Sequence, residues 1–392
     1  MTSFWENVLA LKKSTDKLYI YGAGLYGQNI YRILKERNIE VAGFLVTEID
    51  DNQKKLELPI QKADKMLEKN DIGIILGLNR NNEIQVQAYL KKKGFNKKNV
   101  ISCSDYIEGH AERGGYDQVA TVEITTKIGC SVNCRFCPQK SLITKYFEDN
   151  CDRDVYMAID TFRKCLKKMP ENCHILFCGM AEPFLNPDCL EMMKIACESG
   201  RKVDLYTTLV GANIEIVKEV CKLPLNFVTL HVADEKNYAN IPKTEEYYEM
   251  VEMLLNCQKA DGSSLVNMCN AQTKADGRIA DMCRGKYDIL TTMLDRAGNL
   301  NDEELYAKRN LKGKLSCSLC GQALNHNILL PDGTLLLCCM DYGMKHILGN
   351  LMEQTYEEIM NGNVLNKIRR GMQGDESVDL LCRNCSSANC CN

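Results

Sequence analysis

The sequence has no long hydrophobic run and no marked excess of either charge. No apolar stretch approaches the roughly 18 residues of a membrane-spanning helix, and the first residues alternate apolar and charged side chains instead of forming the apolar core of a signal peptide. Lys and Arg number 49 against 52 Asp and Glu, so the net charge of −3 gives no electrostatic reason to expect a nucleic acid. We therefore expect a cytoplasmic protein that binds neither membrane nor nucleic acid.

Cysteine, by contrast, is abundant. The chain has 392 residues, enough for two or three domains, and 22 of them are cysteines. Disulfide frameworks belong mostly to small, loop-rich, exported chains, and this chain has none of these properties, so we interpret the thiols as reduced. About half of them stand singly at periodic apolar positions, where a free cysteine behaves as a small hydrophobic residue.

Three cysteines follow one predicted strand within eight residues. The β-rich segment 120–126 and a glycine lead to Cys130, Cys134 and Cys137. Thiols this close together cannot occupy three independent core positions, so we expect them to converge on zinc, copper(I) or an iron–sulfur cluster. A structural zinc needs four ligands, and no fourth Cys or His follows before Cys151. Three ligands favour a four-iron cluster with one open iron.

The spacing C-x3-C-x2-C, with Phe136 before the last cysteine, resembles that of the radical S-adenosylmethionine (SAM) superfamily. The resemblance implies that Cys130, Cys134 and Cys137 hold a [4Fe–4S] cluster, that Phe136 lies beside the cofactor, and that the open iron binds the amino and carboxylate groups of SAM. It also implies an electron donor such as flavodoxin or ferredoxin, and a 5′-deoxyadenosyl radical that takes a hydrogen atom from a substrate. A structural zinc is the alternative.

Strands and helices alternate from residue 119 to about 293. Strands are predicted at 119–126, 174–178, 202–207, 226–232, 265–269 and 288–293, with helices such as 155–168, 187–198 and 243–257 between them. Six repeats favour a partial (β/α)6 barrel, whose reactive groups belong at the C-terminal ends of the strands. The three cysteines follow the first strand, as this rule requires.

Polar residues end the next three strands. Gly179 and Glu182 follow the second strand and resemble the superfamily's Gly-Gly-Glu motif, which implies contact with the SAM amino group; an ordinary turn with a helix-capping acid is the alternative. Thr207 and Thr208 end the third strand, and His231 ends the fourth. They are candidates for contact with the SAM ribose or the substrate, although strand ends also carry residues that only cap the next helix.

Two residues near the last strands complete the candidates in this region. Cys269, near the end of the fifth strand, is the first cysteine to test as a hydrogen-atom donor. Arg296 follows the sixth strand, and we interpret it as a member of a surface ion pair rather than a ligand for a carboxylate.

The C-terminal residues hold a second group of cysteines. Cys320, Gly333 and Cys338 have the spacing C-x12-G-x4-C, and Cys382 and Cys385 follow as C-x2-C. This pattern resembles the SPASM/twitch extension of radical SAM enzymes, which implies one auxiliary [4Fe–4S] cluster held by these four cysteines.

Other readings of this segment stay open. A zinc ribbon would use Cys317 and Cys320 with the later pair, and Cys339, Cys390 and Cys391 have no assigned partner. Residues 327–337 predict a β-hairpin with a Pro-Asp-Gly turn. A charged linker is expected at 301–314.

Residues 1–105 predict a Rossmann-like βαβ domain. A strand at 17–21 leads into Gly22, Gly24 and Gly27 and then a helix to about residue 36. Further strands are predicted at 40–46, 72–76 and 99–102, with a helix at 82–93. Glycines in this position let the backbone approach a phosphate at a helix N-terminus. The domain resembles those attached to sugar acyltransferases and polysaccharide-tailoring enzymes, and both a nucleotide site and a purely structural turn are open readings.

These features predict an α/β chain with a Rossmann-like domain (1–105), a radical SAM core (116–305) and a SPASM/twitch domain (310–392). The favoured function is hydrogen abstraction from a sugar, aminocyclitol or nucleotide-linked sugar, ending in oxidation or epimerisation. In an oxidation the auxiliary cluster would accept the substrate's electron, and in an epimerisation a thiol would return a hydrogen atom to the substrate. The alternatives are a maturase that modifies a ribosomally made peptide and an iron–sulfur electron-transfer protein.

Overall fold

The computed structural model describes residues 4–49, 56–67, 71–78, 80–103, 119–291, 295–300, 309–317, 319–320 and 323–390. The chain divides into two compact units, residues 1–114 and 115–392. The expected boundary at 104–118 and most of the expected linker at 301–314 lie outside the described residues. In the part of the chain that is described, no helix is long and apolar enough to cross a membrane.

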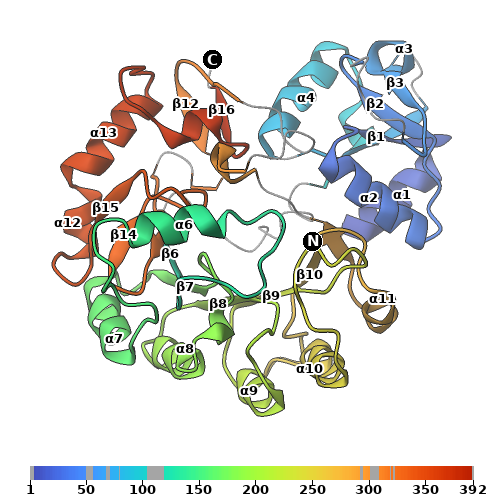
Figure 1. Ribbon diagram of the computed structural model, residues 1–392. Helices are drawn as coiled ribbons and strands as arrows, with labels where there is room; N and C mark the ends of the chain where they lie inside the picture. Colours follow the sequence, from blue (N-terminus) through green and yellow to red (C-terminus); the bar gives the residue numbers. More distant parts are fainter. Residues whose placement is uncertain are drawn as a thin grey trace. The chain divides into compact units, whose positions relative to one another are not determined.

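The first unit contains a parallel five-stranded sheet in the order β3-β2-β1-β4-β5 (Figure 1). Its strands are β1 (Lys17–Tyr21), β2 (Gly43–Val46), β3 (Ile60–Lys62), β4 (Ile72–Leu76) and β5 (Val100–Ser102). Its helices are α1 (Phe4–Ser14), α2 (Leu25–Glu36), α3 (Ala63–Leu67), α4 (Arg80–Lys92) and the 3-10 turn η1 (Lys97–Asn99). This strand order is compatible with a Rossmann-like domain. The sequence did not predict β3, whose three residues are only partly buried.

The second unit contains a nine-stranded sheet in the order β11-β10-β9-β8-β7-β6-β13-β14-β15 (Figure 1). Its first six strands in sequence are β6 (Thr121–Ile124), β7 (His174–Phe177), β8 (Val203–Thr207), β9 (Phe227–His231), β10 (Met268–Ala271) and β11 (Ile289–Thr291). Neighbours among these six pair in parallel, so all six predicted strands of the partial barrel are confirmed.

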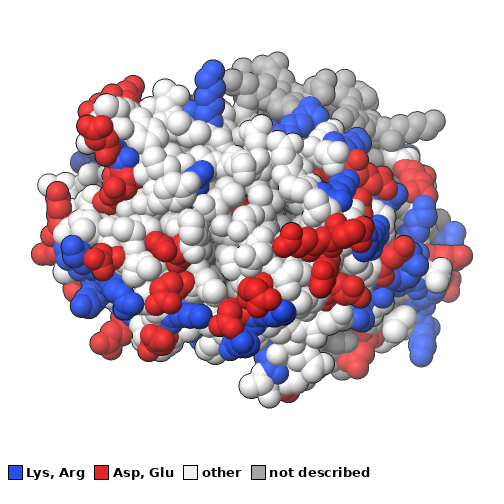
Figure 2. Space-filling model, turned by 60° about the horizontal axis from the view of Figure 1, so that its bottom comes forward, with Lys and Arg blue, Asp and Glu red and all other residues white. Residues whose placement is uncertain are grey.

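The helices α7 (Ile159–Lys168), α8 (Cys189–Glu198), α9 (Ile214–Val220), α10 (Glu245–Asn256) and α11 (Gly277–Cys283) lie along one face of the sheet (Figure 1). The helix α6 (Gln139–Tyr146) lies apart from them and packs with residues of β13 and β14 in a separate buried cluster (Figure 1). The 3-10 turns are η2 (Pro183–Leu185) and η3 (Arg296–Gly298). Figure 2 shows basic and acidic side chains interspersed over this region. Ion pairs such as Lys218–Glu215 and Lys194–Glu219 lie on exposed helix positions, where each contributes little to stability.

The C-terminal residues extend the same sheet. The strand β13 (His326–Leu329) pairs in parallel with β6, and β14 (Thr334–Leu336) and β15 (Ile347–Asn350) continue antiparallel. β13 and β14 form the predicted hairpin. The remaining elements are α12 (Tyr356–Met360), α13 (Asn363–Met372), η4 (Leu381–Asn384) and the antiparallel pair β12 (Leu315–Cys317) and β16 (Ala388–Cys390). The sheet therefore runs across the expected division at 305–310, which stays a prediction.

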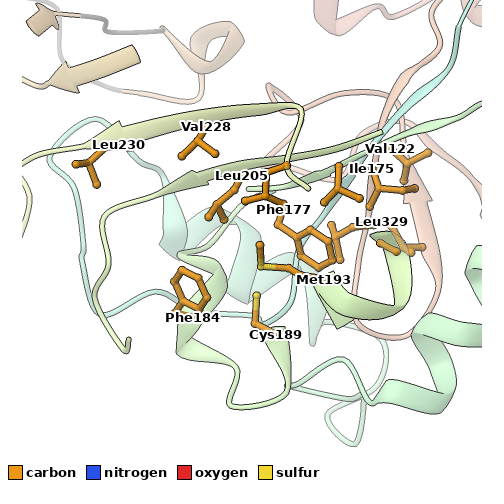
Figure 3. Packing of buried hydrophobic residues seen from close by; sticks show 14 of the residues in the cluster. Val122, Ile175, Phe177, Phe184, Cys189, Met193, Leu205, Val228, Leu230 and Leu329 are labelled. Atoms are coloured by element: carbon orange, nitrogen blue, oxygen red, sulfur yellow. The ribbon is translucent and has the colours of Figure 1, made fainter. Parts of the chain in front are cut away.

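The two faces of the sheet differ in chemistry. Alternate residues such as Val122, Ile175 and Leu205 are fully buried and belong to the same hydrophobic cluster as Cys189 and Met193 of α8 (Figure 3). Residues one position away, including Glu123, Asp204 and Asn270, are also buried but polar. Because side chains of a strand point alternately to opposite faces, the apolar set holds the helices and the polar set faces the inside of the barrel.

Candidate active site

A cavity of about 190 Å³ lies at the C-terminal ends of β6 to β10. All the residues that the sequence predicted for the SAM site line it: Cys130, Cys134, Phe136, Cys137, Gly179, Glu182, Thr207, Thr208 and His231. These residues thus meet at one cavity at the C-terminal ends of the strands, and their roles there stay predictions.

The cysteine loop presents its thiols to this cavity. Asn133 has a left-handed backbone with φ of 41°, and the Cys137 amide donates to the Cys134 carbonyl at 3.0 Å, so the loop turns back on itself. The Glu182 amide lies 3.4 Å from Cys130 Sγ and can donate to it. Burial, followed by the neighbouring Cys137 and Cys130, raises the pKa of Cys134 to about 12. A soft metal would replace the proton that the Cys134 thiol otherwise keeps.

Three converging thiols of this kind fit the corners of an iron–sulfur cluster that leaves one iron open. Among the described residues, no group of three or more His, Cys, Asp or Glu is arranged to hold a single metal ion.

Glu182 is held rigidly by the end of β8. Its Oε1 accepts from Thr207 Oγ1 at 2.6 Å, and its Oε2 accepts from the Thr208 amide at 2.6 Å and from Thr208 Oγ1 at 2.7 Å. It also caps η2, but the bond from the Phe184 amide is long at 3.4 Å. Capping is thus its weakest contact. Two carboxylate oxygens offer about four acceptor positions, and these four donors fill them, so an external donor such as an ammonium group would take the place of the long bond from the Phe184 amide on Oε1.

Gly179 must be glycine for this arrangement. Its φ is +57°, and a Cβ there would lie 2.3 Å from Thr125 Oγ1 and 2.7 Å from the Thr125 backbone. We expect Gly179→Ala to lower the free energy of unfolding by about 3 kcal/mol, from the left-handed backbone and the overpacking together. The matched control is Gly200→Ala, which has φ of +75° but open space around the Cβ; it should cost only about 1 kcal/mol. Urea unfolding of both variants measures the difference, and equal losses would contradict the clash.

Hydrogen-bonding side chains from β8 onward also line the cavity. They include Tyr206, His231, Asn270, Gln272 and Arg296. Burial, followed by the charge of Arg296, lowers the pKa of His231 to about 4, so the imidazole is neutral near pH 7. The buried atoms Gln272 Oε1 and Arg296 Nε have no hydrogen-bond partner within the described ranges.

The interpretation of Arg296 as a surface ion pair is wrong. The residue lines the cavity, no described carboxylate pairs with it, and its Nη1 lies 3.5 Å from the Cys339 carbonyl oxygen. Burial would lower its pKa, but the surrounding groups that can carry negative charge, beginning with Tyr342 and Cys137, raise it. The guanidinium therefore stays charged inside the site.

The structure does not bring Cys269 into this cavity. It is fully buried in the apolar core and contacts Cys283 of α11, while its neighbour Asn270 lines the cavity. Sequence reasoning also missed Gln139, Cys178 and Tyr342, which all line the cavity. Cys178 could have been found because it directly follows β7, but Tyr342 lies 205 positions from Cys137 and carries no sequence signal.

The C-terminal cysteines gather at a second place. The charges of Cys317, Cys338 and Cys382 all act on Cys320, which contacts Cys317 directly, and Cys385 lies beside Cys317 and Cys382. Cys317 therefore lies in the same group as the four predicted ligands, Cys320, Cys338, Cys382 and Cys385. Burial raises the pKa of Cys385 to about 12.

The other C-terminal cysteines differ in their surroundings. Cys339 packs with Cys137 and Tyr342 in a separate apolar cluster, and it also interacts electrostatically with Cys385, Cys317 and Cys338. Cys390 is exposed, and Cys391 lies outside the described residues.

The glycine-rich turn of the first unit is explained largely by packing. A Cβ at Gly27 would lie 1.9 Å from the Gly22 carbonyl oxygen, and Gly22 itself has φ of +107°. Of the three glycines in this turn, only Gly24 has open space where a Cβ would lie. A cavity of about 630 Å³ in this unit adjoins Lys17, at the opposite end of β1 from the turn. Nucleotide binding at the turn stays a prediction.

Comparisons with known families agree with this geometry. The sequence model of the radical SAM superfamily matches residues 124–281, and that of the SPASM iron–sulfur cluster-binding domain matches residues 320–386. The chain therefore carries a radical SAM domain and a SPASM-type domain. Its cofactors are therefore [4Fe–4S] clusters and SAM.

Individual relatives are distant. Two curated proteins named "Probable dual-specificity RNA methyltransferase RlmN", from Synechococcus sp. strains CC9902 and RCC307, are each 25% identical, over 160 and 151 residues. These matches cover 36% and 35% of this chain and 42% of each relative, so the chain spans less than half of their length.

The solved structures that resemble this chain are also distant from it in sequence. The complex of BtrN with AdoMet and 2-DOIA is 14% identical with a TM-score of 0.47, covering 68% of this chain and 93% of BtrN. SuiB of Streptococcus suis, bound to its precursor peptide SuiA, is 12% identical with a TM-score of 0.42, covering 92% of this chain and 82% of SuiB.

Proposed function

We propose that this chain reductively cleaves SAM and takes a hydrogen atom from a polar small molecule, favoured as a sugar, aminocyclitol or nucleotide-linked sugar, which is then oxidised or epimerised. The observation that carries the proposal is one cavity that joins the cysteine loop, the Glu182 carboxylate and a wall of hydrogen-bonding side chains. An electron-transfer protein would need neither the open cavity nor that wall.

The roles of the residues follow from their positions. Cys130, Cys134 and Cys137 would hold the cluster, which when bound with SAM supplies the electron that cleaves the sulfonium. Glu182 would bind the SAM ammonium group, and Thr207 and Thr208 keep its carboxylate oriented toward the cavity. Burial of Glu182 raises its pKa, but the three short hydrogen bonds from the threonines favour the charged form.

The polar side chains that line the cavity support a hydroxyl-bearing substrate. Gln272 Oε1 is a buried acceptor and Arg296 Nε a buried donor, and both lack partners among the described residues. Each such group costs about 1–3 kcal/mol unless a ligand pairs with it. A sugar or cyclitol hydroxyl both donates and accepts, so it can satisfy both atoms. A peptide would have to pair with both atoms through its backbone or a polar side chain, whereas a sugar or cyclitol presents hydroxyl groups around its ring, and this favours the small polar molecule.

The second cysteine group would hold an auxiliary cluster through Cys320, Cys338, Cys382 and Cys385. Cys338 is followed directly by Cys339, whose carbonyl oxygen contacts Arg296 of the cavity wall. This path, which consists of one peptide bond and one hydrogen bond, supports electron exchange with the auxiliary cluster.

The test is anaerobic reconstitution with iron, sulfide, SAM and dithionite, followed by assay of 5′-deoxyadenosine. Uniformly deuterated sugars, aminocyclitols and nucleoside diphosphate sugars are supplied one at a time, and deuterium in 5′-deoxyadenosine identifies the molecule that lost hydrogen. We expect one of these compounds to transfer deuterium. Transfer only from a peptide would replace the proposed substrate class, and absence of 5′-deoxyadenosine from protein with intact clusters would refute the enzyme assignment.

A further inference from the structure

Tyr342 contacts the cysteine loop from the C-terminal part of the chain. Its hydroxyl oxygen lies 3.2 Å from Cys137 Sγ, and the residue is only 2% exposed. Among the described residues, Cys137 is the hydrogen-bond partner of this hydroxyl. A thiolate bound to iron has no proton, so in the loaded protein the hydroxyl would be the donor and the sulfur the acceptor.

The loop that carries Tyr342 is firmly built. The Asp341 amide donates to the Cys338 carbonyl at 3.1 Å, and the Asp341 carboxylate accepts from the amides of Lys345 and His346 at 2.8 and 2.7 Å. The loop is therefore fixed at both ends. It begins at Cys338, a proposed ligand of the auxiliary cluster, and reaches a proposed ligand of the first cluster four residues later.

Neighbouring groups fix the ring and add positive charge. The aromatic ring packs with Ile128, Leu142 and Met180 in a buried cluster, and the Arg296 guanidinium lies 5.4 Å from the ring centre. Gln139 Nε2 also lies 3.3 Å from Cys137 Sγ, and because an amide nitrogen carries two hydrogens it can donate to this sulfur as well as to the Met180 carbonyl. Among the described residues, Cys137 Sγ thus has two side-chain donors, and the tyrosine hydroxyl is the one that comes from the C-terminal segment.

Hydrogen bonds to the sulfurs of an iron–sulfur cluster are one of the means by which a protein sets its reduction potential. The reduced cluster carries one more negative charge than the oxidised one, so a donor at the sulfur stabilises the reduced form more and raises the potential. We propose that Tyr342 is a positioning residue that holds Cys137 and raises the reduction potential of the SAM-binding cluster. The inference rests on the proposed ligand role of Cys137 and on no particular substrate.

The test is a redox titration of the reconstituted full-length protein, in which a low-potential chemical reductant donates one electron per cluster. Electron paramagnetic resonance follows the signal that changes on addition of SAM, because only the cluster with an open iron responds. We expect Tyr342→Phe to make reduction of this cluster about tenfold less favourable, which is a shift of about 59 mV to more negative potential for one electron. The auxiliary signal should keep its potential.

The matched control is Tyr146→Phe, which removes a buried hydroxyl from the same apolar cluster. That hydroxyl donates to the Asp154 carbonyl at 2.9 Å and does not contact a sulfur. Its variant should titrate like the wild type. An unchanged potential in Tyr342→Phe, an equal shift in the control, or loss of iron from the first site of Tyr342→Phe would each overturn the proposal, the last because the bond would then serve assembly and not the potential. Neither the redox titration nor the iron analysis requires the substrate.

Discussion

Cys134→Ala is expected to form no 5′-deoxyadenosine above background when it is supplied with SAM and dithionite. Two thiolates cannot fix the three irons that leave a single corner open for SAM. The iron content should fall from about eight to about four per chain, because the C-terminal site does not involve this loop. Iron and sulfide analysis with chromatography of the reaction measures both effects.

The matched control is Cys165→Ala, which removes a thiol from the apolar core. Cys165 lies on α7, is fully buried in the hydrophobic core and does not line the cavity. Its loss should cost about 1 kcal/mol of stability and leave SAM cleavage at the wild-type level. Cleavage by Cys134→Ala, or its loss in the control, would contradict the proposed ligand set.

The first cluster site could be located from sequence because its signals are local. The three cysteines follow one strand directly, and Glu182 and Thr207 follow the next two. Since neighbouring parallel strands bring their C-terminal ends to one edge, residues that are far apart in the chain become neighbours by rule. The observed bond between Thr207 and Glu182 at 2.6 Å is a consequence of that rule.

The position of Cys269 shows the limit of such reasoning. Knowing that a strand ends near residue 269 does not say which of two successive residues faces the cavity, because side chains alternate between faces. Asn270 faces the cavity and Cys269 packs against Cys283. An error of one residue in placing the strand therefore makes a core residue such as Cys269 look like a candidate hydrogen-atom donor.

Tyr342 could not be placed from sequence for a different reason. Its position depends on β13 pairing in parallel with β6, which carries the C-terminal segment back beside the first strand. Nothing in the periodicity of either strand specifies that partner, since both are buried on both faces. Long-range pairing of this kind brings a residue from the C-terminal segment within 3.2 Å of Cys137.

Replacing Cys382 and Cys385 together by alanine is expected to leave SAM cleavage intact and to abolish turnover of the substrate. The proposed auxiliary cluster loses two of four thiolates, so the iron content should fall to about four per chain. The double change is needed because Cys317 lies close enough to Cys320 and Cys385 to replace a single lost ligand. Measuring 5′-deoxyadenosine and product in the same reaction separates cleavage from turnover, and a variant with full turnover would remove the auxiliary cluster from the mechanism.

Cys317→Ala tests which four of the five converging cysteines bind the cluster. If the ligands are Cys320, Cys338, Cys382 and Cys385, this variant keeps about eight irons and full coupling between cleavage and product. If Cys317 is a ligand, about four irons are lost and one of the proposed ligands is free. A four-cysteine zinc site made from Cys317, Cys320 and the later pair predicts a third result, in which the wild type holds about four irons and one zinc. Metal analysis of the wild type and of this one variant therefore decides between the three arrangements.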